Sequence, residues 1–147
     1  QNQLSGMTGA SMPTGSVLQV LETSSATDLT TTSTTLVDSG HSIAITPSST
    51  SSKVFVQMTF NCNVNANSTG LQYALYRGST KIGDTGIAYI TTAGSNTHFP
   101  TSLQHLDSPS STSEVTYKLY ISSNSGGSVR LASDWGHVRI AAMEIAG

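Results

Sequence analysis

Four histidines are the side chains best suited to metal binding in this 147-residue chain. A protein metal site needs several converging ligands, and structural zinc ligands in particular are closely spaced in sequence. These histidines lie far apart and each stands alone, so only the fold or a three-fold axis could gather them. We therefore expect surface or loop histidines, and we predict neither a metal nor a cofactor. The residues concerned are His41, His98, His105 and His137.

Carboxylates are the second possible source of chemistry, because acid–base catalysis needs two of them in one cleft. Only Asp107, Glu114 and Asp134 fall in or beside predicted loops, and nothing in the sequence connects them. Asp107 precedes Ser108 and Pro109 and is expected to cap a turn. Nucleophile-elbow, zinc-protease, phosphate-loop and calcium-loop motifs are all absent. The sequence thus predicts a protein that is not an enzyme, with a depolymerase as a remote alternative.

Trp135 is the only tryptophan, and it stands in a polar stretch between Asp134 and Gly136. An aromatic side chain on a loop can stack on a sugar ring or anchor a protein partner. The alternative is a tryptophan folded back as a lid over the domain. We single out Trp135 and Asp134 as candidates for contact with a partner or a glycan.

Composition narrows the class of protein. Charged residues make up 10% of the chain and the net charge is −2, which excludes a basic surface for nucleic acid. The sequence contains no apolar run long enough for a membrane span. The single Cys62 excludes an internal disulfide and is expected to be a buried thiol. A hydrophobic content of 36% is low, and favours a thin sandwich or a protomer that completes its core in an oligomer.

The strongest structural signal lies in residues 53–64, where apolar and mostly polar residues alternate. Period-2 alternation is typical of a strand with one buried face. We predict a long central strand whose inward side chains are Val54, Val56, Met58, Phe60, Cys62 and Val64. Asn61 and Asn63 should then lie on its other face.

Shorter strands, separated by Gly, Ser, Asn and Pro, are predicted on both sides of this one. Residues 16–22 carry apolar side chains on both faces, which predicts burial on both sides. Residues 93–101 are predicted to be a loop because they contain Gly94, Asn96 and Pro100. Eight to ten short strands without a helical pattern indicate an all-β protein, an antiparallel β-sandwich of jelly-roll type.

We divide the chain into an extended N-terminal arm, residues 1–15, and a β-sandwich domain, residues 16–147. The arm shows no periodicity and holds three glycines and a proline. Its apolar residues could lie on a neighbouring protomer, and simple disorder is the alternative. The candidate arm contacts are Leu4, Met7 and Met12. A start at Gln1 rather than Met is typical of a fragment or a processed form.

Three aromatic residues fall on the second face of predicted strands: Phe55, Tyr76 and Tyr120. A two-layer sandwich buries only one face of each sheet, so these side chains need another cover. A loop could supply it, but tyrosine is enriched in interface cores. We therefore predict an oligomer interface at these three residues.

Four stretches together resemble a family of small β-domains from tailed bacteriophages, cyanophages and other aquatic phages in particular. They are residues 15–20 (GSVLQV), 45–56 (ITPSSTSSKVFV), 106–119 (LDSPSSTSEVTYKL) and 143–146 (MEIA). The resemblance implies a structural role on the particle exterior, as a tail-fibre C-terminus or a free-standing surface protein. It also implies a homotrimer and transfers no catalytic residues. Residues 132–136 depart from the family pattern, in which this stretch is longer and richer in Asp and Ser.

The resemblance leaves two functional classes. The first is a trimeric tail-fibre or adhesin domain for host attachment, with the fibre shaft and a host surface glycan as further partners. The second is a capsid decoration (cement) protein that clamps neighbouring major capsid subunits. Either protein would be made in the host cytoplasm and reside on the virion surface. The length of the open reading frame distinguishes them, because a long frame ending here would encode a fibre.

Overall fold

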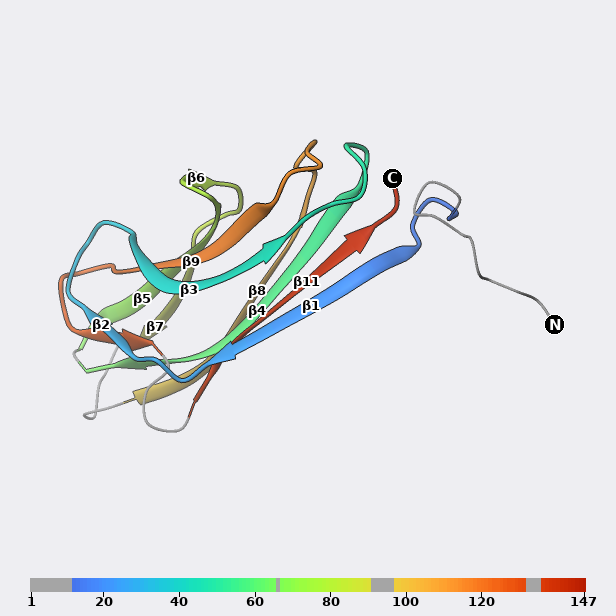
Figure 1. The fold of residues 1–147 in the computed structure, drawn as a ribbon. Coiled ribbons are helices and arrows are strands. Elements are labelled where there is room, and N and C mark those ends of the chain that lie inside the picture. Colours follow the sequence, from blue (N-terminus) through green and yellow to red (C-terminus); the bar gives the residue numbers. More distant parts are fainter. Residues whose placement is uncertain (1–11, 66, 91–96, 132–135) are drawn as a thin grey trace.

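The computed structural model describes residues 12–65, 67–90, 97–131 and 136–147. The described residues form two antiparallel sheets that pack face to face, which confirms the predicted β-sandwich (Figure 1). They contain no helix, and hence none long and apolar enough to cross a membrane. The strands are β1 (Val17–Ser25), β2 (Leu29–Thr31), β3 (Val37–Ile45), β4 (Lys53–Val64), β5 (Thr69–Arg77), β6 (Thr80–Lys81), β7 (Gly86–Ile90), β8 (Thr97–Asp107), β9 (Val115–Ser123), β10 (Val129–Leu131) and β11 (Val138–Ile145).

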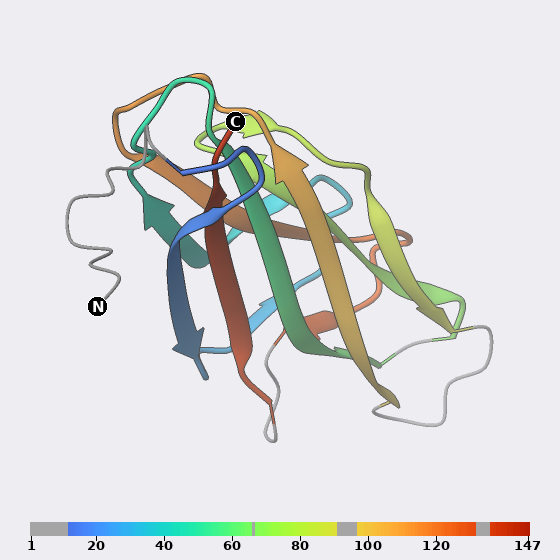
Figure 2. The ribbon, with the colours of Figure 1, turned by 90° about the vertical axis from the view of Figure 1, so that its right-hand side faces the viewer.

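Strand order identifies the sandwich as a jelly roll. In the first sheet β1, β11, β4 and β8 lie side by side, as Figure 2 shows, and β10 and β2 extend it beside the end of β4. In the second sheet the order is β3, β9, β5 and β7, with β6 beside the end of β5. Because the chain passes repeatedly from one sheet to the other, strands that are neighbours in the first sheet are distant in sequence.

The predicted central strand is confirmed as β4, with the predicted bounds. It pairs with β8 along nearly its whole length on one side, and with β11 and then β10 on the other. The inward face is buried as expected, and Phe60 contacts Tyr73 of the second sheet edge to face at 5.4 Å. On the outward face Asn61 is half-buried. Asn63 is fully buried, and its amide nitrogen lies 3.1 Å from Nε2 of His98.

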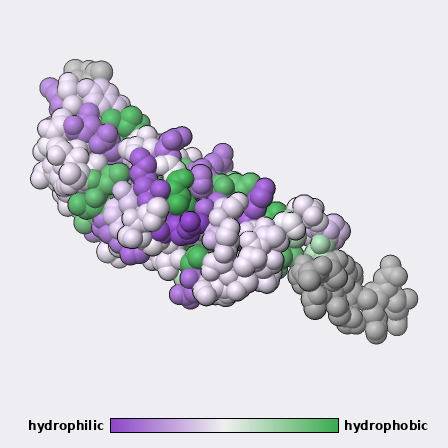
Figure 3. All heavy atoms as spheres, turned by 90° about the horizontal axis from the view of Figure 1, so that it is seen from above, coloured by the Kyte–Doolittle hydropathy of each residue, from purple (hydrophilic) through white to green (hydrophobic). Residues whose placement is uncertain are grey.

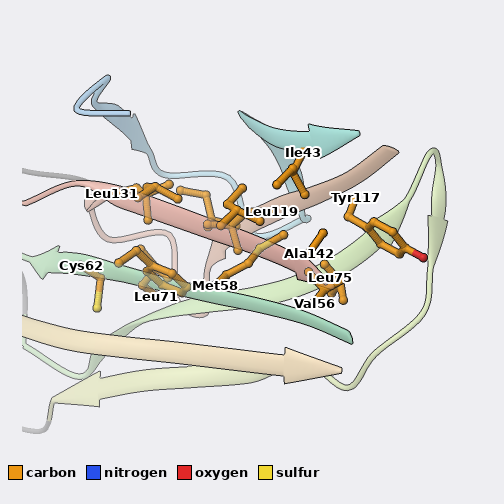
Figure 4. Close-up of a cluster of buried hydrophobic side chains, with 14 of the residues drawn as sticks. Ile43, Val56, Met58, Cys62, Leu71, Leu75, Tyr117, Leu119, Leu131 and Ala142 are labelled. Carbon is orange, nitrogen blue, oxygen red and sulfur yellow. The ribbon is translucent and has the colours of Figure 1, made fainter. Parts of the chain in front are cut away.

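The core fills the space between the sheets (Figure 4). Met58 and Ala142 of the first sheet face Leu119 and Tyr117 of the second, and all four are fully buried. Cys62 is also buried, as predicted, and its sulfur lies 3.3 Å from Oγ1 of Thr101. Burial raises the pKa of this thiol, so it remains protonated and unreactive at neutral pH.

Two local predictions were wrong. β1 is not buried on both sides, because among the described strands it pairs only with β11, and Val17 is 53% exposed. Residues 97–101 are not loop but the first half of β8. Pro100 lies opposite Asn61 in that strand. An edge strand accepts a proline because the missing N–H is not needed on its free side.

Candidate interaction surfaces

Four apolar side chains form a continuous row across the outer face of the first sheet. In the strand register Val20 pairs with Met143, Met143 with Phe55, and Phe55 with Leu106. Directly paired side chains on one face are close enough to touch. Val20 is 58% and Leu106 49% exposed, while the two central residues are half-buried. This apolar row therefore presents a band that crosses four strands, about 15 Å wide.

The apolar row lies toward the end of the sheet where the N-terminal arm enters. Val17 and Ile145 are paired with each other just beyond it and extend the band. There the backbone N–H of Gly15 donates to the carbonyl of Ala146 at 2.8 Å, and the N–H of Ala146 donates to Ser16 at 2.8 Å. The described residues that precede β1 thus join the sandwich beside an exposed apolar surface. Figure 3 shows a different face, where hydrophobic residues form only small separate groups.

A second surface, the tyrosine face, occupies the outer side of the second sheet. The rings of Tyr76 and Tyr120 stack there with centroids 3.8 Å apart and planes 20° apart. Both are half-buried, and Ala74, which pairs with Tyr120, is fully buried. Beside them the ammonium of Lys118 donates to Asp38 at 2.8 Å.

β7 adds two exposed apolar residues to the tyrosine face, Ile87 and Tyr89. Tyr89 lies opposite Gly70, and a Cβ on that glycine would be only 2.9 Å from both side chains. The glycine therefore lets the two side chains lie flat against β5. Sequence reasoning missed these residues, although their alternation with smaller residues was a visible signal.

The three predicted interface residues therefore do not form one patch. Tyr76 and Tyr120 are brought together, whereas Phe55 belongs to the apolar row on the opposite side of the sandwich. The predicted arm contacts Leu4 and Met7 lie outside the described residues, and Met12 is half-buried at the start of the described chain. Trp135 and Asp134 also lie outside the described residues.

A polar hollow of about 460 Å³ opens on the outer face of the first sheet, at the end away from the arm. It lies between β4, β8 and β11. Gly136 passes so close to Asn61 that a Cβ would lie 2.8 Å from the asparagine side chain. The lining residues are Thr59, Phe60, Asn61, Pro100, Thr101, Ser102, Gly136, His137 and Arg139.

Two carboxylates are buried between the sheets at the arm end, one on each side of Val54 in the strand register. Asp107 receives hydrogen bonds from Tyr117 and from the guanidinium of Arg77, so it forms an ion pair rather than the expected turn cap. Glu144, which sequence reasoning missed, receives hydrogen bonds of 2.6 Å from the backbone N–H and the hydroxyl of Ser48.

Each of these carboxylates is saturated by its own donors, so the pair does not form an acid–base site. Burial alone would raise the pKa of Glu144, but hydrogen bonds, led by those from Ser48, outweigh it and the pKa is lowered. Burial raises the pKa of Tyr117, and its hydrogen bond to Asp107 raises it further. Both groups therefore hold the sandwich together without exchanging protons near neutral pH.

The histidines remain separate. His41 is buried at the edge of the second sheet, with Nε2 3.1 Å from the carbonyl oxygen of Thr27, and His98 lies beside Asn63. His137 lines the polar hollow. Within the described residues, no three His, Cys, Asp or Glu side chains are placed to hold a metal ion.

Comparison with known proteins identifies no family, since no family model and no curated protein matches the chain. Among solved structures it is similar to T=1 particles of infectious bursal disease virus, with a TM-score of 0.46 and 14% identity. It is also similar to the T=13 particle of that virus, with a TM-score of 0.45 and 13% identity. Each of these two matches covers 87% of this chain and 36% of the viral protein.

PorU from Porphyromonas gingivalis is similar with a TM-score of 0.43 and 9% identity, over 95% of this chain and 14% of PorU. Similarity at this level does not assign a function.

Proposed function

We propose that the chain is a non-enzymatic structural domain of a virus particle exterior, and specifically a trimeric bacteriophage tail-fibre or adhesin domain that serves host attachment. The observation that supports an oligomer is that two apolar surfaces, the apolar row and the tyrosine face, lie on opposite sides of one sandwich. When two different surfaces meet, the contact is head to tail, and such contacts form a closed ring where the rotation between successive copies closes and an open filament where it does not. Closure at three copies comes from the phage resemblance of the sequence.

The position of the arm supports mounting on a larger assembly. Gly15 and Ser16 are hydrogen-bonded to Ala146 at one end of the first sheet. In a closed ring every copy has the same orientation along the axis, so all arms would emerge at the same end. That arrangement suits attachment to a fibre shaft. It leaves the polar hollow, at the other end of the sheet, free to face outward.

A capsid decoration protein is the second candidate. The exposed edge strand β1 and the apolar row beside the arm favour it, since a strap from this edge could run across a neighbouring capsid subunit. Antibody labelling of intact particles in the electron microscope separates the two roles. Gold-conjugated antibody bound to the fibres supports the attachment role, and antibody bound to the head supports decoration. Absence of the protein from purified particles contradicts both.

The oligomer is tested by native mass spectrometry at micromolar concentration. Leu106→Ser weakens the apolar row and Tyr76→Ser weakens the tyrosine face, so each variant should lose the trimer. Gln104→Ser, an exposed neighbour on the same face of β8, is the matched control and should remain trimeric.

Mixing the two defective variants tests the head-to-tail arrangement. The Leu106→Ser chain keeps its tyrosine face and the Tyr76→Ser chain keeps its apolar row, so one sound interface remains. A heterodimer is therefore expected. A monomeric wild-type chain, or variants that never pair, would contradict the proposal.

A further inference from the structure

We propose that the polar hollow binds an acidic oligosaccharide, a sugar chain bearing carboxylates. Its volume of about 460 Å³ falls within the range of small-ligand sites, about 300–1,000 Å³. The inference rests on the proposed attachment role for its biological meaning, whereas the binding itself is measured on the chain alone.

Apart from Thr101, whose hydroxyl contacts Cys62, the polar side chains that line the hollow have no partner within the described part of the chain. Thr59, Asn61, Ser102, His137 and Arg139 line the hollow, and none of them makes a side-chain hydrogen bond or ion pair with a described residue. Hydroxyl and amide groups both donate and accept hydrogen bonds, as sugar hydroxyls do. The hollow therefore matches a ligand rich in hydroxyls better than an apolar one.

The backbone keeps these groups in place. Thr59 and Asn61 project from the same face of β4, opposite Ser102 and Pro100 of β8. Gly136 packs directly against the asparagine on the other side, at a distance that no residue with a Cβ could adopt. Because paired strands are rigid, the hollow is formed before any ligand arrives, which lowers the entropic cost of binding.

The charge of the hollow selects for an acid. Arg139 lies opposite Thr59 and His137 two residues before it, and the described residues that line the hollow include no Asp or Glu. Glu22 shares a smaller neighbouring hollow with Arg139 but forms no ion pair with it. The guanidinium is therefore available to a carboxylate, with which it forms two parallel hydrogen bonds.

The test titrates the 147-residue chain with a β-1,4-linked glucuronic acid trisaccharide, using calorimetry and amide chemical-shift mapping. Cellotriose is the neutral match, since it has a hydroxymethyl group at each position where the acidic sugar has a carboxylate and is otherwise the same. Saturable binding of the acidic sugar is expected, with shifts at the lining residues and at least about tenfold weaker binding of cellotriose. The affinity should also fall as salt is added.

Variants locate the site. Arg139→Gln should weaken binding of the acidic sugar about tenfold, and Ser102→Ala should weaken it several-fold. Lys53→Gln removes an exposed positive charge from the same face at the other end of β4, and should change the affinity less than about twofold. Thermal melts of each variant confirm that the fold is intact.

Three results would overturn the inference: no saturable binding of the acidic sugar, equal binding of cellotriose, or unchanged affinity in Arg139→Gln. The proposed function fails separately. A trimer on particles that does not bind the sugar contradicts only the ligand site, whereas a monomer absent from particles that binds it contradicts only the structural role.

Discussion

The hydroxyl of Tyr117 donates a 2.7 Å hydrogen bond to the carboxylate of Asp107, across the interior between the two sheets. The same carboxylate accepts from Arg77 at 2.8 and 3.0 Å. Tyr117 is fully buried and Asp107 is 7% exposed, while the arginine side chain is one-third exposed. The cluster therefore joins β8 of one sheet to β5 and β9 of the other at the arm end of the sandwich.

Removing the tyrosine hydroxyl should destabilise the sandwich. Tyr117→Phe leaves Asp107 with the arginine alone, and should lower the free energy of unfolding by about 1.5–3 kcal/mol. Asp107→Ala should cost at least as much, about 3 kcal/mol, because it removes the carboxylate partner of both the buried Tyr117 hydroxyl and the Arg77 guanidinium. Urea denaturation measures both changes. A cost below about 0.5 kcal/mol for Tyr117→Phe would mean that water replaces the bond.

Glu144 predicts a loss of stability in acid. Because its pKa is lowered in the folded state, its contribution is complete above the ordinary glutamate value of 4.5 and is lost as the pH falls through the lowered pKa. Glu144→Gln should cost about 1.5–3 kcal/mol at pH 7, and its stability should fall less steeply than that of the wild type between about pH 5 and pH 3. Urea midpoints across this range test it, and parallel curves for the two proteins would refute it.

His41 predicts a second pH dependence, nearer to neutrality. Burial lowers its pKa more than the hydrogen bond to Thr27 and the charge of Asp38 raise it. The unfolded chain therefore binds a proton first, so stability should begin to fall as the pH drops below the ordinary value of 6.5. His41→Gln keeps a donor for the Thr27 carbonyl and should flatten the melting temperature between about pH 7 and pH 5. If the melting temperature of the variant falls with pH as steeply as that of the wild type, His41 is not the source of the pH dependence.

Gly86 should not tolerate a side chain. A Cβ there would lie 2.3 Å from the ring of Tyr73, which packs edge to face on Phe60 in the core. Gly86→Ala should therefore displace the ring and cost about 1–3 kcal/mol. Gly83→Ala is the control, because its Cβ would meet only ordinary contacts, 3.7 Å from Leu75 and 3.9 Å from His105. Equal melting temperatures for the two variants would show that Tyr73 moves freely.

The local pattern of the sequence was enough to predict which residues of β4 face the core. Alternation has period 2 in any strand, so the buried positions of residues 53–64, including the thiol of Cys62, follow from side-chain geometry alone. The absence of a helical period likewise predicted an all-β fold. These features depend only on residues close together in the chain.

The surfaces depended instead on which strands become neighbours. Val20 and Met143 are far apart in sequence, yet they meet in the apolar row because β1 pairs with β11. Pro100 and Asn61 line one hollow because β8 lies beside β4. Alternation tells which face a side chain occupies but not which strand lies next to it. Backbone hydrogen bonds are the same for every residue, so register and neighbours are decided by the packing of the whole sandwich.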